Sequence, residues 1–259
     1  WFGNNEHVVN WQHDGMEVRA FVDEINKLRP GGRLKNQDRY FKESLTYTAI
    51  SSGPFASRYN GTGFLFDSKG SCIFSEGMAL PDVLTYLNSK VAQSFLDILC
   101  PTLDYSNLGV NSLPIKTDVK SDCFNALLGS AKSDWDAYET SWDFTTLPLL
   151  SPDHRSGTLE ATYARLRAHW AGMTEEVQRL EEENNRIFID AYGLQDELTP
   201  EVPIEEITLT CNPAYRYGVK GTEEDRETRL LADTMKEFIS YAIGCMFGRY
   251  SLDAPGLIL

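Results

Sequence analysis

An apolar seam with heptad spacing constrains the fold of this chain more than any other feature. Apolar side chains recur at alternating intervals of four and three residues, which places them on one face of a single long helix. The seam consists of Leu159, Tyr163, Leu166, Trp170, Met173, Val177, Leu180, Asn184 and Ile187. At 1.5 Å per residue, this pattern predicts a helix roughly 42 Å long.

The surroundings of this seam indicate what the helix packs against. Asn184 occupies a seam position, where a polar side chain commonly fixes the register of packed helices. The flanks carry five acidic residues, which repel DNA: Glu175, Glu176, Glu181, Glu182 and Glu183. We therefore expect a strut packed on protein, and the sequence leaves open whether its partner is internal or external.

Two other helices are predicted. One begins at Pro81, because proline suits the first helical turn, and extends to Leu99. The other runs from Glu223 to Phe247, and its second half is apolar nearly all round, so it is expected to be buried, with Gly244 allowing a close helix contact. The longest apolar run, residues 238–247, is too short to span a bilayer, so we expect no membrane association.

Strand patterns lie in the first half of the chain. They cover Thr46–Ile50, Gly63–Asp67 and Ser71–Phe74, with the last two expected to form a hairpin across residues 68–70. The sequence therefore predicts an α+β fold, in which a small mixed α/β domain is followed by a mainly helical domain with the long heptad-patterned helix. The expected divisions are residues 1–120, a connector at 121–157 with few periodic signals, and a helical support at 158–259.

Charge is unevenly distributed along the 259 residues, whose net charge is −14. Residues 1–120 hold 12 basic and 13 acidic side chains, whereas residues 121–259 hold 12 basic and 25 acidic. Within the first part, residues 27–58 contain seven basic side chains against two acidic ones, interleaved with aromatic residues. Phosphates attract such charges and bases stack on aromatic rings, so this window favours a nucleic-acid-binding face. The alternative is a solvated loop with ordinary surface lysines and arginines.

Several stretches resemble one protein family. They include Arg39-Tyr-Phe-Lys-Glu-Ser-Leu-Thr-Tyr-Thr-Ala-Ile-Ser-Ser52, Gly63-Phe-Leu-Phe-Asp-Ser-Lys-Gly70, Trp142-Asp-Phe144, Asn185-Arg-Ile-Phe-Ile-Asp-Ala-Tyr-Gly-Leu194 and Phe238-Ile-Ser-Tyr-Ala-Ile-Gly-Cys-Met-Phe247. In this order and spacing they resemble the target-recognition region of adenine-specific DNA methyltransferases, most closely the PglX-type enzymes of bacterial BREX phage-defence systems. The resemblance extends over nearly the whole chain.

This resemblance implies that residues 1–120 form a target-recognition domain for double-stranded DNA and that the remainder supports it. Lysine and arginine would position the DNA backbone, and polar side chains would read base edges. The candidate DNA-binding residues are Arg33, Lys35, Arg39, Tyr40, Lys42, Tyr47, Ser51, Ser52, Arg58, Tyr59 and Lys69.

Thr46 and Thr48 are weaker candidates. Strand alternation puts them on the same face as Ile50, so a buried Ile50 would turn both threonines inward and Tyr47 outward. Asn88 is expected to have a structural role, because its neighbours Leu87 and Val91 have core positions.

The tetrapeptide Asn212-Pro213-Ala214-Tyr215 is similar to the catalytic Asn-Pro-Pro-Tyr motif of adenine methyltransferases, whose aromatic ring stacks on the flipped base. Its third position is alanine, and no glycine-rich turn precedes it to hold S-adenosylmethionine. We therefore expect a turn with no catalytic residue and no cofactor in this chain. The resemblance implies that the catalytic domain, with S-adenosylmethionine, precedes Trp1, so the expected partners are DNA, that domain and other defence-system proteins.

Two alternatives remain. The acidic helical part could be a protein-interaction module that docks other defence components or mimics DNA towards a DNA-binding partner. A free-standing enzyme built on residues 212–215 is the second alternative, and the missing cofactor loop argues against it. The five cysteines are scattered without ligand spacing, which indicates no metal site and a reducing, cytoplasmic location.

Overall fold

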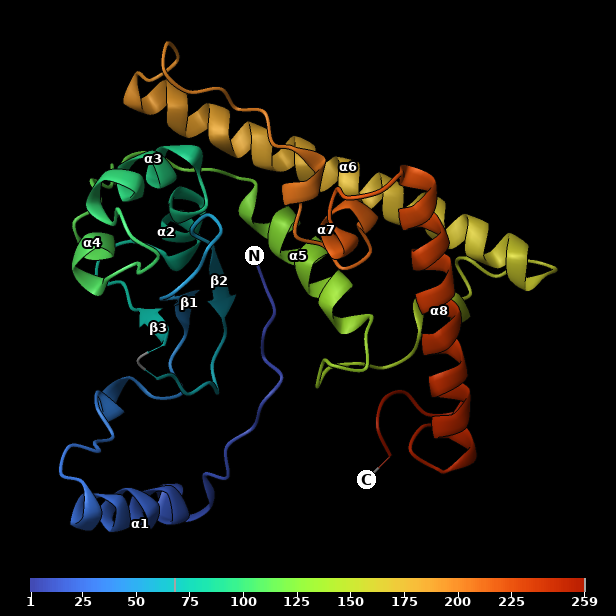
Figure 1. Cartoon of the computed structure of the whole chain (residues 1–259), viewed down its shortest axis with the longest axis horizontal. Helices are drawn as coiled ribbons and strands as arrows, with labels where there is room; N and C mark the ends of the chain where they lie inside the picture. Colours follow the sequence, from blue (N-terminus) through green and yellow to red (C-terminus); the bar gives the residue numbers. More distant parts are fainter. Residues whose placement is uncertain (68, 259) are drawn as a thin grey trace.

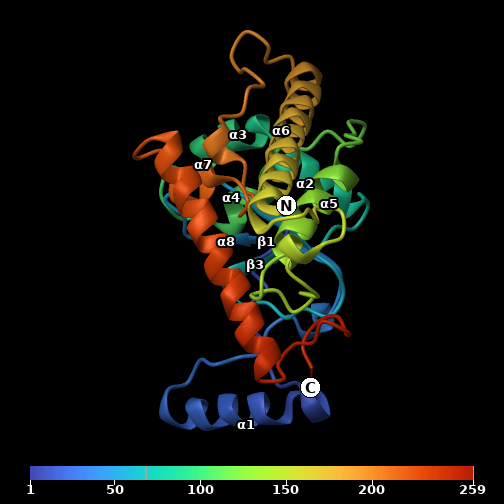
Figure 2. The same cartoon turned by 90° about the vertical axis from the view of Figure 1, so that its right-hand side faces the viewer.

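The computed structural model describes residues 1–67 and 69–258, and it confirms the predicted α+β class. The long helix α6 extends along one side of the molecule, with the sheet and α2–α4 near one of its ends and α8 towards the other (Figure 1). Figure 2 shows α1 at the end of the molecule farthest from α6. The α-helices are α1 (Gln12–Leu28), α2 (Leu80–Leu87), α3 (Lys90–Leu99), α4 (Asn107–Asn111), α5 (Phe124–Asp136), α6 (Leu159–Tyr192), α7 (Pro213–Tyr217) and α8 (Glu223–Met246).

The sheet has three antiparallel strands in the order β2-β1-β3, namely β1 (Ser44–Thr48), β2 (Ser57–Asn60) and β3 (Gly70–Ile73). The predicted strand at Gly63–Asp67 is wrong. Gly63 has a φ of 99°, and its N–H donates to the carbonyl of Phe41 at 3.0 Å instead of joining a ladder. The predicted hairpin is also wrong, because β3 pairs with β1; Ser68 of its expected turn lies outside the described residues.

The helix predicted from Pro81 to Leu99 is divided into α2 and α3. Ser89 caps α3, since its hydroxyl accepts the N–H of Ala92 at 3.3 Å. Asn88 bonds the backbone of Ser57 in both directions, with its amide oxygen accepting at 2.8 Å and its amide nitrogen donating at 3.0 Å. These side-chain bonds compete with a continuous helix and confirm the structural role expected for Asn88.

The predicted heptad helix is confirmed as α6, and its seam packs within the chain. Leu166, Trp170, Val177 and Leu180 are buried, and α6 contacts α3 and α5. Asn184, also buried, donates from Nδ2 to the carbonyl of Thr85 in α2 at 2.9 Å. The partner of the seam is therefore internal over most of its length, although Leu159 at the first turn is 46% exposed.

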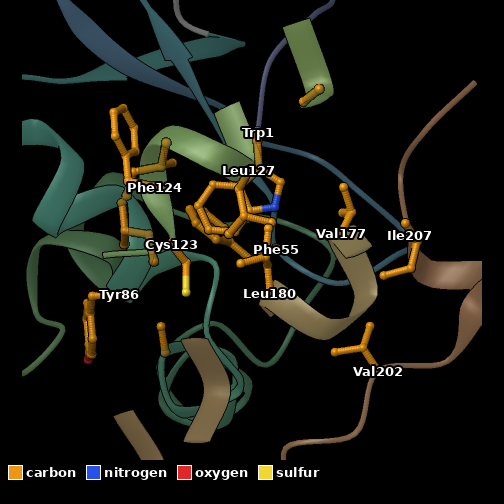
Figure 3. Close-up of a cluster of buried hydrophobic side chains, with 14 of the residues drawn as sticks. Trp1, Phe55, Tyr86, Cys123, Phe124, Leu127, Val177, Leu180, Val202 and Ile207 are labelled. Carbon is orange, nitrogen blue, oxygen red and sulfur yellow. The ribbon is translucent and has the colours of Figure 1, made fainter. Parts of the chain in front are cut away.

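One large hydrophobic cluster joins both halves of the sequence. Trp1 inserts among residues of α5 and α6, including Leu127 and Leu180 (Figure 3). Its indole N–H donates to Glu181 at 2.7 Å. The cluster continues through Leu45 of the sheet to Leu230 of α8. The division into residues 1–120, 121–157 and 158–259 stays a prediction, although helix α5 forms where a connector was expected.

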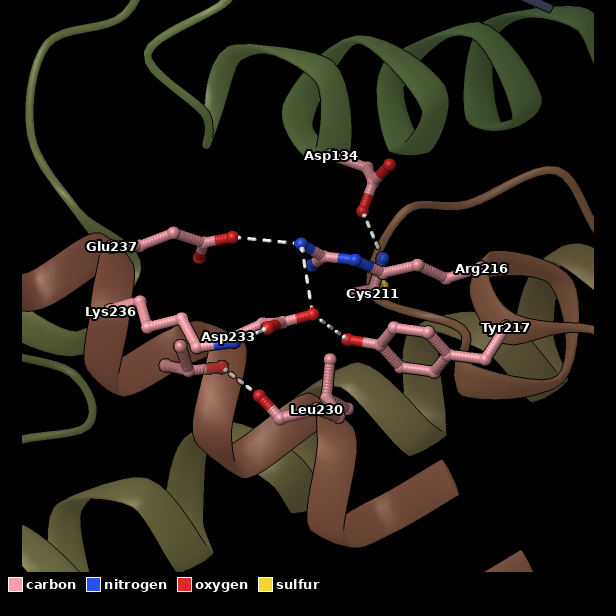
Figure 4. Close-up of polar contacts among 9 residues, drawn as sticks. Asp134, Cys211, Arg216, Tyr217, Leu230, Asp233, Lys236 and Glu237 are labelled. Carbon is pink, nitrogen blue, oxygen red and sulfur yellow. Dashed lines mark hydrogen bonds and ion pairs between the residues drawn. The ribbon is translucent and has the colours of Figure 1, made fainter. Parts of the chain in front are cut away.

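Helix α8 has the predicted bounds within one residue, and a capping box of Thr222 and Asp225 begins it. Polar contacts attach it to α7: Arg216 donates to Glu237 at 2.9 Å, and Tyr217 donates to Asp233 at 2.8 Å (Figure 4). On the other side of this region, the buried carboxylate of Asp134 accepts the N–H groups of Thr210 and Cys211 at 2.6 and 2.9 Å.

The predicted burial of the second half of α8 is wrong. Four of its apolar side chains are 42% to 86% exposed, namely Ile239, Ile243, Met246 and Phe247. Gly244 does permit a close approach, but its neighbour is the ring of Tyr250 just beyond the helix, not another helix. None of the helices that the structure describes combines the length and apolar character that a bilayer crossing requires.

Candidate nucleic-acid interface

The two faces of the sheet differ in character. Leu45 and Tyr47 of β1 are at most 2% exposed and belong to the main hydrophobic cluster. Thr46 and Thr48 lie on the opposite face, together with Arg58, which pairs with Thr46 across β1 and β2. Thr46 and Thr48 would point into the core only if Ile50 were buried on their face of the strand. Ile50 instead lies beyond the end of β1 and is 52% exposed.

A groove with a volume of about 790 Å³ lies on this polar face. Its walls come from residues 2–11, the sheet, residues 63–67 and residues 135–143, which are far apart in the sequence. Gly3 has a φ of 120°, and a Cβ there would lie 2.8 Å from the Trp135 ring, so glycine allows the first segment to pass close to that ring. Seven phenylalanine and tryptophan side chains among the described residues line the groove: Phe2, Trp11, Phe41, Phe64, Phe66, Trp135 and Trp142.

Arg58 lines this groove, and no carboxylate among the described residues pairs with it. One terminal nitrogen donates to the Thr48 hydroxyl at 3.0 Å, while Nε is buried without a hydrogen-bond partner in the part of the chain that the structure describes. None of the ion pairs among residues 1–67 and 69–258 includes Arg58. Burial lowers the pKa of this guanidinium because it penalises the charged form. A half-buried cation of this kind is costly to leave unpaired.

Two amides in the same groove have unused hydrogen-bonding capacity. The Asn60 side chain is 5% exposed, and its Oδ1 has no donor nearby among the described residues. Asn5 likewise has a buried Nδ2 without an acceptor in that part of the chain. Both residues line the groove, which therefore combines an unpaired cation, an unpaired acceptor and an unpaired donor with aromatic walls. Unsatisfied buried groups are rare in folded proteins, so their concentration at one place marks a candidate binding site.

The predicted DNA-binding residues divide into three groups by position. Five are exposed around the sheet and its loops: Arg33, Lys35, Lys42, Ser52 and Lys69. Another four are half-buried, and most have partners within the protein: Arg39, Tyr40, Ser51 and Tyr59. Of the remaining two, Arg58 lines the groove and Tyr47 lies in the core.

The partners of these residues distinguish them further. Arg39 donates to Glu76 at 2.6 Å, so its charge is already compensated. Tyr59 donates to Glu43, and burial together with this bond raises the pKa of Tyr59 to about 12. Tyr47 is 2% exposed and donates to Asn107 at 2.6 Å. Its burial follows from strand alternation, because it shares the inner face with Leu45.

Most of the residues that line the groove were not among the candidates, and these include Asn5, Asn60, Trp135 and Trp142. No local pattern identifies them, because they come together only through the tertiary fold. Trp142 is 62% exposed, and its indole N–H donates to the carbonyl of Glu6 at 3.2 Å.

The tetrapeptide at residues 212–215 forms the start of the short helix α7 instead of a bare turn. The Asn212 side chain, 2% exposed, donates to the carbonyls of Ile204 and Ile207 and accepts the N–H of Ala214. Its amide is thus fully used in holding the loop. Across residues 1–67 and 69–258, no group of three or more His, Cys, Asp or Glu side chains could hold a metal ion.

The chain therefore combines an α+β fold with an aromatic groove on the polar face of its sheet, and comparison with known proteins shows which proteins it resembles. No protein-family model matches it. It is 38% identical over 268 residues to "Adenine-specific methyltransferase PglX" of Lacticaseibacillus casei (strain Zhang) and 36% identical over 262 residues to "Adenine-specific methyltransferase BrxX" of Escherichia coli O9:H4 (strain HS).

These alignments cover 99% and 100% of this chain but 20% and 21% of the two relatives. The chain thus spans about a fifth of the length of the curated relatives it matches. The expected resemblance to PglX-type adenine-specific methyltransferases is confirmed.

Proposed function

We propose that this chain is the DNA-sequence-recognition part of a site-specific adenine DNA methyltransferase of a BREX-type phage-defence system. The observation that supports this most directly is the aromatic groove with its uncompensated Arg58. A methyltransferase extrudes its target base from the duplex, so a separate surface must hold the flanking DNA and select the site. The exposed residues Arg33, Lys35 and Lys42 supply positive charge for the phosphates around that surface.

The test is fluorescence anisotropy with the complete gene product that contains this sequence, on cognate and scrambled duplexes at several salt concentrations. Replacing Arg33, Lys35 and Lys42 together by alanine should weaken binding to all sequences and lower the salt slope by up to about three units. The matched control removes three exposed cations from the helical part: Arg155, Arg165 and Lys220. Equal effects of the two triple variants, or no effect of either, would contradict the assignment of the DNA-binding surface.

The catalytic step, in this proposal, belongs to another part of the longer protein, which binds S-adenosylmethionine. Support comes from Asn212, whose side chain is engaged in structural hydrogen bonds. We expect isothermal calorimetry to detect no saturable S-adenosylmethionine binding by the 259-residue chain alone. Saturable binding would contradict this expectation and would favour an active site that includes the tetrapeptide at residues 212–215.

A protein-docking role for the helical part is the second candidate function. The exposed apolar side chains at the end of α8 support it, as does the excess of acidic residues in 121–259. The catalytic domain of the same protein is the expected partner. Replacing Ile243 and Phe247 by serine should then reduce methylation without changing DNA affinity, and unchanged methylation would exclude this role for the patch.

A further inference from the structure

The hydrogen-bonding groups of the groove on the sheet indicate whether it suits a phosphate or the edge of a base pair. A phosphate oxygen only accepts hydrogen bonds, whereas the edge of a base pair presents donors and acceptors side by side. The unsatisfied groups of the groove include both kinds, since Arg58 Nε donates and Asn60 Oδ1 accepts. An unpaired acceptor has no use opposite a phosphate, so this combination favours a base edge.

The charges that line the groove lead to the same conclusion. Asp67 and Asp143 are part of its walls, and Asp67, which has no ion pair among the described residues, would repel a phosphate at close range. Asp67 is held by the N–H groups of Lys69 and Gly70 at 2.7 and 2.8 Å, and these bonds lower the pKa of Asp67, so it is charged at neutral pH. Asp143 is paired with Lys132 at 2.8 Å. Among the described residues that line it, the groove has one unpaired cation, two carboxylates and seven phenylalanine and tryptophan rings, which suit an uncharged aromatic ligand better than an anion.

Arg58 and Asn60 are spaced to act together. They are alternate residues of β2, so both side chains project from the same face of the sheet. The bond from Arg58 to Thr48 fixes one terminal nitrogen and leaves Nε unpaired within the described residues. A guanidinium donor next to an amide acceptor complements the major-groove edge of a G·C pair, where N7 and O6 of guanine accept and N4 of cytosine donates.

We propose that Arg58 and Asn60 read one G·C base pair of the recognised site, with the base edge entering the groove. This rests on the proposed function and adds to it the specificity-determining residues and the base pair that they select. In this arrangement the two side chains, whose Nε and Oδ1 atoms are buried in the absence of DNA, turn towards the base edge, so that Arg58 donates to guanine and Asn60 accepts from the cytosine amine. The exposed cations outside the groove contact phosphates and contribute no sequence preference.

The experiment uses the complete gene product and begins with the methylated motif found by long-read sequencing of the host genome. Binding is then measured by anisotropy on the motif duplex, on a scrambled duplex and on duplexes in which each base pair is exchanged singly. Arg58→Lys keeps the charge but loses the planar fork, and Asn60→Ala loses the acceptor. Both should weaken cognate binding about 10- to 100-fold, scrambled binding less than about 3-fold, and remove discrimination at a single G·C position.

The outcome of Arg58→Gln is more specific. A glutamine amide pairs with adenine, so the preferred base at that one position should shift from G towards A in the sequenced methylome, while the rest of the motif stays the same. If Arg58→Lys does not fold, as judged by its thermal melting, Asn60→Ala and Arg58→Gln still test the proposal, because each removes one of the two proposed contacts with the base pair.

The controls separate this inference from the proposed function. Arg33→Ala should weaken cognate and scrambled binding equally. If Arg58→Lys and Asn60→Ala behave like Arg33→Ala, or change nothing, base reading by this groove is wrong, while recognition by the basic surface can still hold. If the unmodified protein itself binds motif and scrambled duplexes equally, the proposed function fails as well.

Discussion

Truncation of Leu166 tests whether α6 is held by packing within this chain. Leu166 is fully buried and is the third of the nine seam residues. Leu166→Ala removes three buried carbon atoms, which is about 2.4 kcal/mol of lost transfer free energy at about 0.8 kcal/mol for each. A void of about 10 Å³ already borders Leu166 and Trp170, so neighbouring side chains do not close freely around missing atoms. With a cavity contribution, the total loss should be about 3–4 kcal/mol.

The assay is urea unfolding of the 259-residue chain followed by circular dichroism, with thermal melting in parallel. A loss of this size should lower the melting temperature by about 6–16 °C for a protein of this length. Leu159→Ala is the matched control, because Leu159 belongs to the same seam of the same helix but is 46% exposed. Its loss should be under about 1 kcal/mol. Similar losses for the two variants, or a loss below about 1 kcal/mol for Leu166→Ala, would refute the packing described for α6.

Two further predictions concern buried and titrating side chains. Asp134→Asn leaves one acceptor oxygen where the N–H groups of Thr210 and Cys211 need two. The unfolding free energy measured in urea should therefore fall by about 1–3 kcal/mol. The control Asp143→Asn changes an exposed carboxylate and should alter the unfolding free energy little. Tyr59 has its pKa raised to about 12 by burial and by its bond to Glu43, against an ordinary value of 10.0, so the folded state keeps a proton that the unfolded state loses between these values. Stability should therefore fall as pH rises from about 10 to about 12, and Tyr59→Phe should lose less stability over this range; parallel pH profiles for the two proteins would contradict this.

Periodic apolar patterns predicted the helices well because burial of one face dictates both the helix and the pattern. For this reason the apolar patterns at residues 159–187 and 223–247 correctly predicted the helices α6 and α8. The division between α2 and α3 was also accessible, since Asn88 and Ser89 are residues that favour helix ends. Strand β2 was not, because its sequence Ser-Arg-Tyr-Asn lacks apolar alternation and its inner residue Ser57 is small and polar.

The candidate site could be predicted only in part. The basic window identified Arg58 through its charge, but charge alone did not separate it from Arg39, which Glu76 neutralises from 37 residues away. Asn60 and Asn5 became notable only when the fold left one polar atom of each buried without a partner among the described residues. The apolar composition of the end of α8 also led to a wrong prediction of burial. An apolar sequence does not show whether the surface that would cover it belongs to the same chain.

The discontinuous origin of the groove affects how such proteins can be engineered. Its floor belongs to β1 and β2, one wall to residues 2–11 and another to residues 135–143. A chimera that transplants only residues 27–70 from a relative would combine a foreign floor with resident walls, and the amide of Asn5 and the ring of Trp142 would no longer match it. The smallest unit that can be exchanged as a set therefore extends from Trp1 to Asp143. Such a graft must also keep the inner face of α6, because Trp1 is anchored there.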